Sequence, residues 1–412
     1  VIKERLNRDN YIEGLIEKHL INNPHKLNYS LVPDTEFNRR NEDAIIEKVH
    51  QKTKSLSVDD KNKIVALAEA LEKRQERIDD PEILPKVTKE DIPLSRNYPN
   101  PNLSIVNNIE NYFYKSGTNG LVYHSMLFPC EALTIDELKI ASLFTSSLTD
   151  IGLGSDSYED VQKYQSSITG GISASFTMIP NKGDSEHKLA LKISGKSLEK
   201  NAHLMQDLMI RTVQEANFGE HQRIQELLSF ISADNEQSLT QNGHVLAMAN
   251  AASQLTEVAS TNDLTSGIRF INNTGLLSKN ISDEGSLDIY IKNLKSIQSK
   301  ISLTPKNIFT ASSLNPDEMD LKSFSGLNAA DVDEQNFIKV QDKSIGWITG
   351  SQVCFCAEAF LTVDSSHEDA PALSVLGTVL RNGYLHSAIR EKGGAYGAGA
   401  MQDSHNSVFK FF

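Results

Sequence analysis

Two kinds of apolar spacing alternate from about residue 102 onward. In segments such as 172–177, Ile172, Ala174 and Phe176 alternate with polar residues, as in a β-strand with one buried face. Stretches such as 133–148 instead carry apolar residues three and four positions apart, as amphipathic helices do. The alternation predicts a fold of class α+β, in which helices pack on a sheet.

The same patterns give expected bounds for each element. Residues 105–114 and 120–128 are predicted to be paired strands, and further strands are expected at 172–177, 188–194, 307–312 and 352–361. Helices are expected at 133–148, 159–168, 198–216, 220–234, 236–255, 283–298 and 370–381. Asn382-Gly383 should break the last helix before one or two more helical turns over 384–390.

The N-terminal part of the chain has a different residue pattern. A helix is expected at 9–22 and a short strand at 25–32. Residues 35–55 and 58–79 predict two helices that interleave acidic and basic side chains and carry only a thin apolar stripe. A charged helical hairpin of this kind is more often a connector than a binding surface.

Composition excludes some partners. The 412 residues include 41 Lys and Arg against 54 Asp and Glu, a formal net charge of −13. Nucleic-acid binding needs clustered basic residues, so no nucleic acid is expected as a partner, whereas basic partners would be favoured. No apolar run approaches the ~18 residues of a membrane span. The start at Val1 and the strand-like end at 409–412 predict a piece of a longer protein.

Cysteine usage points to a reducing compartment. The three cysteines are Cys130, Cys354 and Cys356, and a disulfide framework usually has more of them in a shorter chain. Cys354 and Cys356 are two positions apart, so we expect both to be buried on one side of a core strand. Bacterial cytoplasm, a mitochondrion or a plastid would fit.

Several common active-site motifs are incomplete. A phosphate loop ending at Gly195-Lys196-Ser197 would need glycine in place of Ala190, and a dinucleotide motif would need glycine in place of Gln402. An H-E-x-x-H helix starting at His367 has Pro371 where the second histidine belongs, and no H-x-x-E-H or G-x-S-x-G motif occurs. The residues by themselves spell no complete active site.

The most informative stretch is Arg381–Gly399, which reads RNGYLHSAIREKGGAYGAG. It closely resembles the C-terminal signature of the pitrilysin (insulinase-like) zinc metallopeptidases, and its core is most similar to the presequence-protease and falcilysin branch. Residues 152–173 resemble the third domain of that branch. The charged hairpin and the following Leu84-Pro85 and Asp91-Ile92-Pro93 resemble the linker between its two halves.

The resemblance implies two homologous halves, each of two domains, that enclose a chamber. The expected fold is α+β, with repeated two-layer domains of antiparallel-rich sheet and packed helices, preceded by a helical hairpin linker. Residues 1–33 would end the second domain, 34–94 would be the linker and 95–314 the third domain. Residues 315–344 would be a connector, and 345–412 the first part of the fourth domain.

The resemblance also implies a function. The family's N-terminal half binds Zn²⁺ through the inverted motif and hydrolyses peptides. This chain would be the noncatalytic C-terminal half of such a zinc metalloendopeptidase, inactive alone and without a metal ligand of its own. Its zinc would be bound in the missing N-terminal half. The expected partners are that half of the same polypeptide and an unfolded peptide substrate, such as a targeting presequence.

Arg390 and Tyr396 are the catalytic and substrate-binding candidates that the resemblance transfers to this chain. Arginine is a permanent cation with several N–H donors, tyrosine offers a neutral O–H, and such donors stabilise the oxyanion of peptide hydrolysis. The structural alternative is that Arg390 compensates a helix C-terminus and Tyr396 packs in a strand. His386 could also face the chamber. Thr169-Gly170-Gly171 is interpreted as a turn that opens a strand.

Two other interpretations stay open. The chain could be a noncatalytic binding or assembly subunit built on the same fold, in which case no H-x-x-E-H motif would precede Val1. It could also be an unrelated α+β protein, if the match over Arg390–Tyr396 arose by chance.

Overall fold

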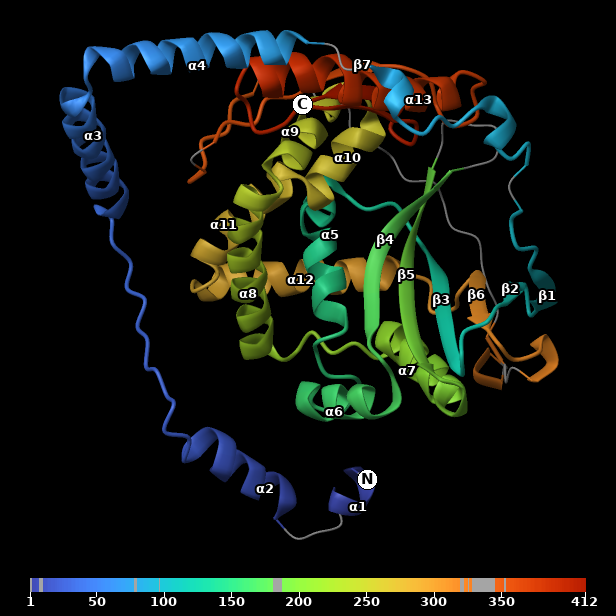
Figure 1. The fold of residues 1–412 in the computed structure, drawn as a ribbon. Helices are drawn as coiled ribbons and strands as arrows, with labels where there is room; N and C mark the ends of the chain where they lie inside the picture. The colour runs from blue at the N-terminus through green and yellow to red at the C-terminus, as the bar shows by residue number, and fades with distance from the viewer. Residues whose placement is uncertain are drawn as a thin grey trace. The chain divides into compact units, whose positions relative to one another are not determined.

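The computed structural model forms two compact units, one ending at Pro85 and the other starting at Lys86 (Figure 1). No helix among the described residues is long and apolar enough to cross a membrane. The predicted domain boundaries stay predictions, and most of the expected connector 315–344 lies outside the described residues. The structure describes residues 2–6, 10–77, 80–95, 97–180, 187–318, 322–324, 326–327, 345–351 and 353–412.

The first unit is helical. It contains α1 (Ile2–Leu6), α2 (Tyr11–Ile16) with a following π-helix (Glu17–Ile21), α3 (Phe37–Ser55) and α4 (Val58–Glu76). The two long predicted helices are confirmed. Helix α4 starts where the Ser57 side chain accepts a hydrogen bond from the Asp60 backbone N–H, and the Asp60 carboxylate accepts one from the Ser57 N–H in return.

The prediction of a strand at 25–32 is wrong. These residues have no regular secondary structure and pair with no strand in the described part of the chain. Their apolar side chains, such as Leu27 and Leu31, are exposed. An alternating pattern indicates a strand only where a neighbouring strand supplies hydrogen bonds and a core covers one face.

The second unit is built on a six-stranded sheet in the order β1-β2-β6-β3-β5-β4. All pairs are antiparallel except β2 with β6. Alternate residues of β2, β3 and β6 are buried, so one face of the sheet meets the core. The strands are β1 (Asn102–Val106), β2 (Ile109–Lys115), β3 (Leu121–Cys130), β4 (Ile172–Pro180), β5 (His187–Leu198) and β6 (Asn307–Ser312).

The predicted pairing of 105–114 with 120–128 is wrong, because β6 lies between β2 and β3. The first of these segments is itself a hairpin, in which β1 turns into β2 at Asn107-Asn108. Both asparagines have positive φ, 51° and 61°, as a two-residue type I′ turn requires. Asparagine tolerates this conformation better than most residues, which is the signal that periodicity alone overlooks.

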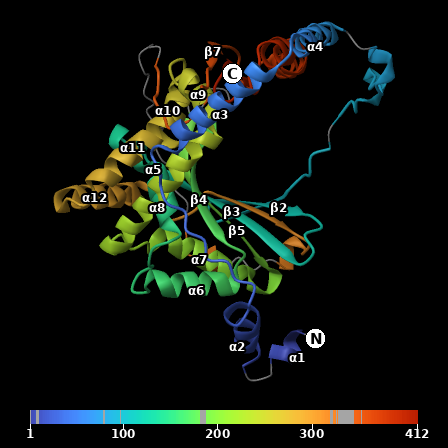
Figure 2. The ribbon, with the colours of Figure 1, turned by 60° about the vertical axis from the view of Figure 1, so that its left-hand side comes forward.

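Helices cover the buried face of the sheet (Figures 1 and 2). Phe144 of α5 stacks on Phe176 of β4 and Phe218, and Met205 of α7 lies against Gly195 of β5. The predicted α+β class is therefore confirmed, although helices α10 and α11 were not predicted. The helices are α5 (Ile135–Leu148), α6 (Tyr158–Ile168), α7 (Ala202–Gln214), α8 (His221–Gln241), α9 (Gly243–Ala252), α10 (Glu257–Ser266), α11 (Ile268–Asn280) and α12 (Glu284–Lys300).

The C-terminal segment adds a three-stranded antiparallel sheet in the order β7-β9-β8. Its elements are β7 (Glu358–Leu361), α13 (Ala370–Leu380), a π-helix (Arg381–Lys392), β8 (Ala400–Asp403) and β9 (Val408–Phe411).

Short 3-10 turns lie outside this segment, at Pro81–Ile83, Lys89–Asp91, Glu199–Asn201, Pro316–Glu318 and Lys322–Phe324.

Two predictions for this segment are wrong. Cys354 and Cys356 are exposed and precede β7 instead of lying in a core strand, because pairing with β9 covers only Glu358–Leu361. Asn382-Gly383 does not break the helix either. The chain passes directly from α13 into the π-helix, which accommodates the pair by hydrogen bonding residues five apart.

Candidate functional site

Arg390 lies in the last turn of the π-helix 381–392. Its side chain is exposed and makes no ion pair with an acidic group in the described part of the chain. The position near a helix C-terminus is the one that the structural alternative requires. An arginine without an acidic partner also keeps its N–H donors available to a ligand.

A tight turn brings Tyr396 close to Arg390 along the backbone. The Gly394 N–H donates to the Arg390 carbonyl over 3.2 Å, and the Ala395 N–H donates to the Ile389 carbonyl over 3.1 Å. Gly394 has φ 72°, a conformation in which a side chain would be strained. Arg390 directly follows Ile389, and Tyr396 directly follows Ala395. The hydrogen bond between Ile389 and Ala395 therefore holds the backbones of Arg390 and Tyr396 near each other.

The Tyr396 side chain is 95% exposed and lies in a bend, not in a strand. The structural alternative for this residue, packing within a strand, is therefore wrong. Two donors, one charged and one neutral, face solvent on either side of a glycine-rich turn. His386, one helical turn before Arg390, is half exposed, and its Nδ1 lies 3.6 Å from Glu391 Oε1.

The block from Gly152 to Tyr158 is held by a residue that the sequence did not single out. The Glu220 carboxylate accepts hydrogen bonds from the backbone N–H of Gly152 (2.6 Å) and of Tyr158 (3.1 Å). The Arg223 guanidinium lies 4.3 Å from the centre of the Tyr158 ring. These contacts fasten the loop between α5 and α6 to the start of α8, which is a structural role.

Thr169-Gly170-Gly171 is a turn between α6 and β4, as predicted. Gly171 has φ 109°, and its N–H donates to Thr169 Oγ1 over 3.0 Å. A Cβ on Gly170 would lie 3.0 Å from the Lys196 side chain. Backbone conformation and close packing thus account for both glycines.

The segment that bears Arg390 and Tyr396 is docked on helices α9 and α10 through the turn between β8 and β9. The Asn262 side-chain amide donates to Asn406 Oδ1 over 2.9 Å, and Thr256 Oγ1 donates to the Asn406 carbonyl over 3.2 Å. Val408 is buried in a small apolar cluster with Ala252 and Ala259. Polar and apolar contacts together hold the turn of the β8–β9 hairpin against α9 and α10.

An ion pair stiffens the same hairpin. Lys410 Nζ lies 2.6 Å from Asp403 Oδ2, which also accepts a hydrogen bond from the Asn406 amide over 2.7 Å. Burial opposes ionisation of Asp403, but the hydrogen bonds from Lys410 and Asn406 outweigh it and lower the pKa of this carboxyl.

A chain of polar contacts joins the loop before β7 to the helices. Trp347 Nε1 donates to Asn250 Oδ1 over 3.2 Å, and the Asn250 amide donates to Asp263 Oδ2 over 2.9 Å. Arg269 lies 3.1 Å from the same carboxylate. Burial raises the pKa of Asp263, against the opposing effects of Asn250 and Arg269.

Metal-binding groups are scattered. Within the residues that the structure describes, no three His, Cys, Asp or Glu side chains gather as a metal ion would need. All three cysteines are free thiols.

Comparisons with known sequences identify a family. Residues 31–276 match the family described as associated with subfamily C of the M16 peptidases. The mitochondrial presequence protease of Drosophila melanogaster is 26% identical over 98% of this chain and 39% of its own length. That of Schizosaccharomyces pombe is 25% identical over 100% of this chain and 42% of its own length. The chain thus spans about two fifths of the length of these curated relatives.

A solved structure shares the fold. It is described as a conserved protein from Enterococcus faecalis V583, with a TM-score of 0.50 and 13% sequence identity, and covers 74% of this chain and 73% of that one. At this identity the likeness concerns the fold alone.

Proposed function

Because the chain belongs to the family associated with subfamily C of the M16 peptidases, we propose that it is the noncatalytic C-terminal half of a zinc-dependent oligopeptidase. The whole protein would enclose unfolded peptides, such as targeting presequences, and hydrolyse them. The observation that carries the proposal is the family match over residues 31–276. Presequence-protease relatives that align with nearly the whole chain, over about two fifths of their own length, support it.

Arg390 and Tyr396 are the residues through which this chain would act on the substrate. Both side chains are exposed beside a glycine-rich turn, where a peptide backbone can approach closely. Arg390 would donate N–H groups to a substrate carbonyl, and Tyr396 would donate its O–H. If one of these carbonyls is the reacting one, the donor stabilises the negative charge that develops on its oxygen.

We propose that zinc is bound by the N-terminal half of the enzyme and not by this chain. The described side chains of this chain do not fit the ion, since they bring no three ligands together. In the N-terminal half, zinc would supply an activated water. The partners of this chain would be that half and the peptide. Its compartment would be a reducing one, and the relatives named above are mitochondrial by name.

Peptide cleavage by this chain and by the longer gene product tests the proposal. Both proteins receive the same unfolded basic peptide, with added zinc and with a chelator as control. We expect chelator-sensitive cleavage by the longer protein only. Cleavage by the 412-residue chain alone would contradict a noncatalytic role. Failure of both proteins over a panel of unfolded peptides would favour a binding or assembly subunit.

A further inference from the structure

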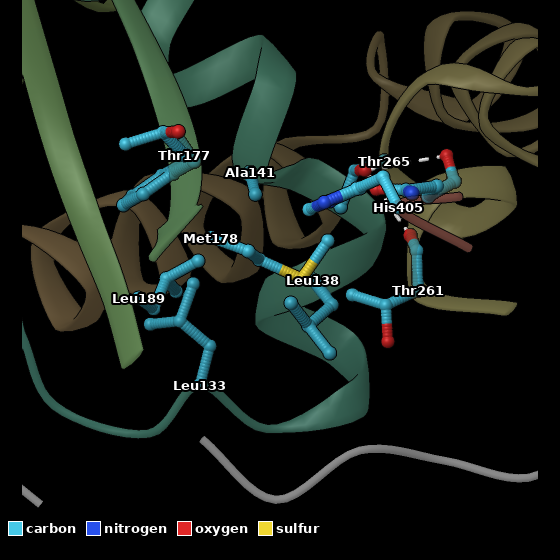
Figure 3. Close-up of a pocket in the computed structure, with 11 residues that line it drawn as sticks. Leu133, Leu138, Ala141, Thr177, Met178, Leu189, Thr261, Thr265 and His405 are labelled. Atoms are coloured by element: carbon cyan, nitrogen blue, oxygen red, sulfur yellow. Dashed lines mark hydrogen bonds between the residues drawn. The ribbon is translucent and has the colours of Figure 1, made fainter. Parts of the chain in front are cut away.

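A cavity of about 260 Å³ lies where helix α5, strand β4, helix α10 and the β8–β9 turn meet (Figure 3). It is smaller than the ~300–1,000 Å³ sites that enclose whole drug-sized ligands, and its size suits one large side chain. Its apolar lining comes from Leu133, Leu138, Ala141, Phe176, Met178 and Leu189. Its polar lining comes from Thr177, Thr261, Asn262, Thr265 and His405.

The cavity reaches the free edge of the sheet. Strand β4 is the last strand in the order and pairs only with β5 within the described residues. Phe176, Thr177 and Met178 follow one another in β4, and all three line the cavity. Consecutive side chains of a strand point to opposite faces, so a cavity that touches all three extends around the strand's edge. Within the described residues, the outer edge of β4 pairs with no other strand, and an unpaired strand edge can bind an added strand.

The cavity is also continuous with the contact between the C-terminal segment and the helices. Asn262 lines the cavity and donates its hydrogen bond to Asn406, and His405 lines it from the neighbouring position. Figure 3 shows His405 on the same side of the cavity as Thr261 and Thr265 of α10, away from Leu133 and Leu189. The cavity is complete only when the segment that bears Arg390 and Tyr396 is docked on α10.

We propose that this cavity is a substrate subsite, in which an extended peptide pairs with the edge of β4 and inserts one large apolar side chain. The inference rests on the proposed function, because a peptidase substrate is the occupant. Main-chain pairing at a sheet edge gives affinity for any extended peptide, and a pocket beside the edge selects the side chain.

Direct peptide binding to the 412-residue chain tests this subsite without needing hydrolysis. The probe is a fluorescein-labelled, nine-residue Ser/Thr-rich peptide with a central leucine, and anisotropy gives its Kd. Replacing the leucine by alanine should weaken binding about tenfold or more, because the apolar side chain leaves its site. N-methylation of the two residues beside the leucine should weaken binding as well, because it removes N–H donors.

Two variants on one strand provide a matched pair. Thr177→Arg places a charge at the cavity, whereas Ser173→Arg places it on the same face of β4 but outside the cavity. We expect the first to abolish the preference for leucine over alanine and the second to preserve it. Met178→Ala, which enlarges the cavity, should shift the preference from leucine toward tryptophan. Circular dichroism verifies that each variant is folded.

Several results would overturn the subsite. Equal Kd values for the leucine and alanine peptides would do so, as would equal effects of Thr177→Arg and Ser173→Arg. Self-association of the chain that Thr177→Arg abolishes would identify a second copy as the occupant instead. The hydrolysis experiment tests the proposed function independently. If the longer protein hydrolyses peptides but the 412-residue chain shows no leucine-dependent binding, only the proposed subsite is wrong. If the chain binds the leucine peptide preferentially but the longer protein hydrolyses no peptide, only the proposed peptidase function is wrong.

Discussion

The two sheets of the second unit bury their side chains to different extents. In the six-stranded sheet, residues such as Val122, Met126 and Phe128 are fully buried under helices. In the C-terminal segment, only β9 is largely buried, strand β7 has no buried residue, and helix α13 buries only Ala370 and Gly377, while Val375 and Val379 are exposed. The first sheet therefore has a core of its own, whereas the second depends on its contacts with α9 and α10.

Removing a core aromatic should have the largest effect on stability. Phe144 is fully buried and stacks on Phe176 and Phe218, so Phe144→Ala should destabilise the chain by about 3–5 kcal/mol. The matched change in the C-terminal segment, Val375→Ala, should cost less than about 0.5 kcal/mol because the side chain is exposed. Urea unfolding measures the free energy of unfolding of both variants. A similar loss of stability in the two would contradict the difference in burial between the two regions.

Loosening the docking contact should have a smaller and local effect. Asn406→Ala removes the side-chain hydrogen bonds to Asn262 and Asp403, each worth about 1 kcal/mol. Hydrogen exchange in β8 and β9 should then accelerate about fivefold or more, with exchange in β3 and β5 unchanged. Acceleration throughout both sheets would mean that they unfold as one cooperative unit.

Acid should weaken the hairpin through Asp403. Its pKa is lowered in the folded chain by the hydrogen bonds from Lys410 and Asn406, despite burial. A lowered carboxyl pKa stabilises the fold at pH values above the ordinary pKa of about 3.9, and this contribution is lost as pH falls through the folded pKa. We expect the protection of the β9 amides, relative to their intrinsic exchange rates, to fall below about pH 4, and Asp403→Asn to remove most of that dependence.

Thiol labelling should distinguish the two regions with little effect on stability. Cys130 is buried in β3, and burial raises the pKa of its thiol to about 12. Cys354 and Cys356 are exposed. A thiol reagent should therefore label Cys354 and Cys356 rapidly in the native chain, and Cys130 only after unfolding. Fast native labelling of Cys130 would contradict the packing of the six-stranded sheet.

The sequence predicted elements well where periodicity and burial coincide. Strands β4 and β6 and helix α5 follow from local spacing. The position of β6 between β2 and β3 does not, because a pairing between residues 180 to 197 positions apart in the chain leaves no local signal. The hairpin at Asn107-Asn108 was missed because its signal is the preference of asparagine for positive φ, not hydrophobicity.

In the candidate site, too, local motifs could be predicted from the sequence, whereas contacts between distant residues could not. Arg390 and Tyr396 came from a resemblance, and the structure adds the turn that brings their backbones together. Glu220, which holds the Gly152 loop, carries no recognisable motif, since its role depends on contacts 62 and 68 positions away. The cavity beside β4 was equally hidden, because five separate segments of the chain contribute to its lining.

The most direct test of the central claim is the rate of peptide hydrolysis by the longer protein with Arg390→Ala. Arg390 is exposed and lacks an acidic partner among the described residues, so the thermal unfolding temperature should not change. We expect kcat to fall by about 10²–10³, the usual effect of losing one oxyanion donor, and Arg390→Lys to recover only part of it. An unchanged kcat in both variants would contradict a role for Arg390 in catalysis.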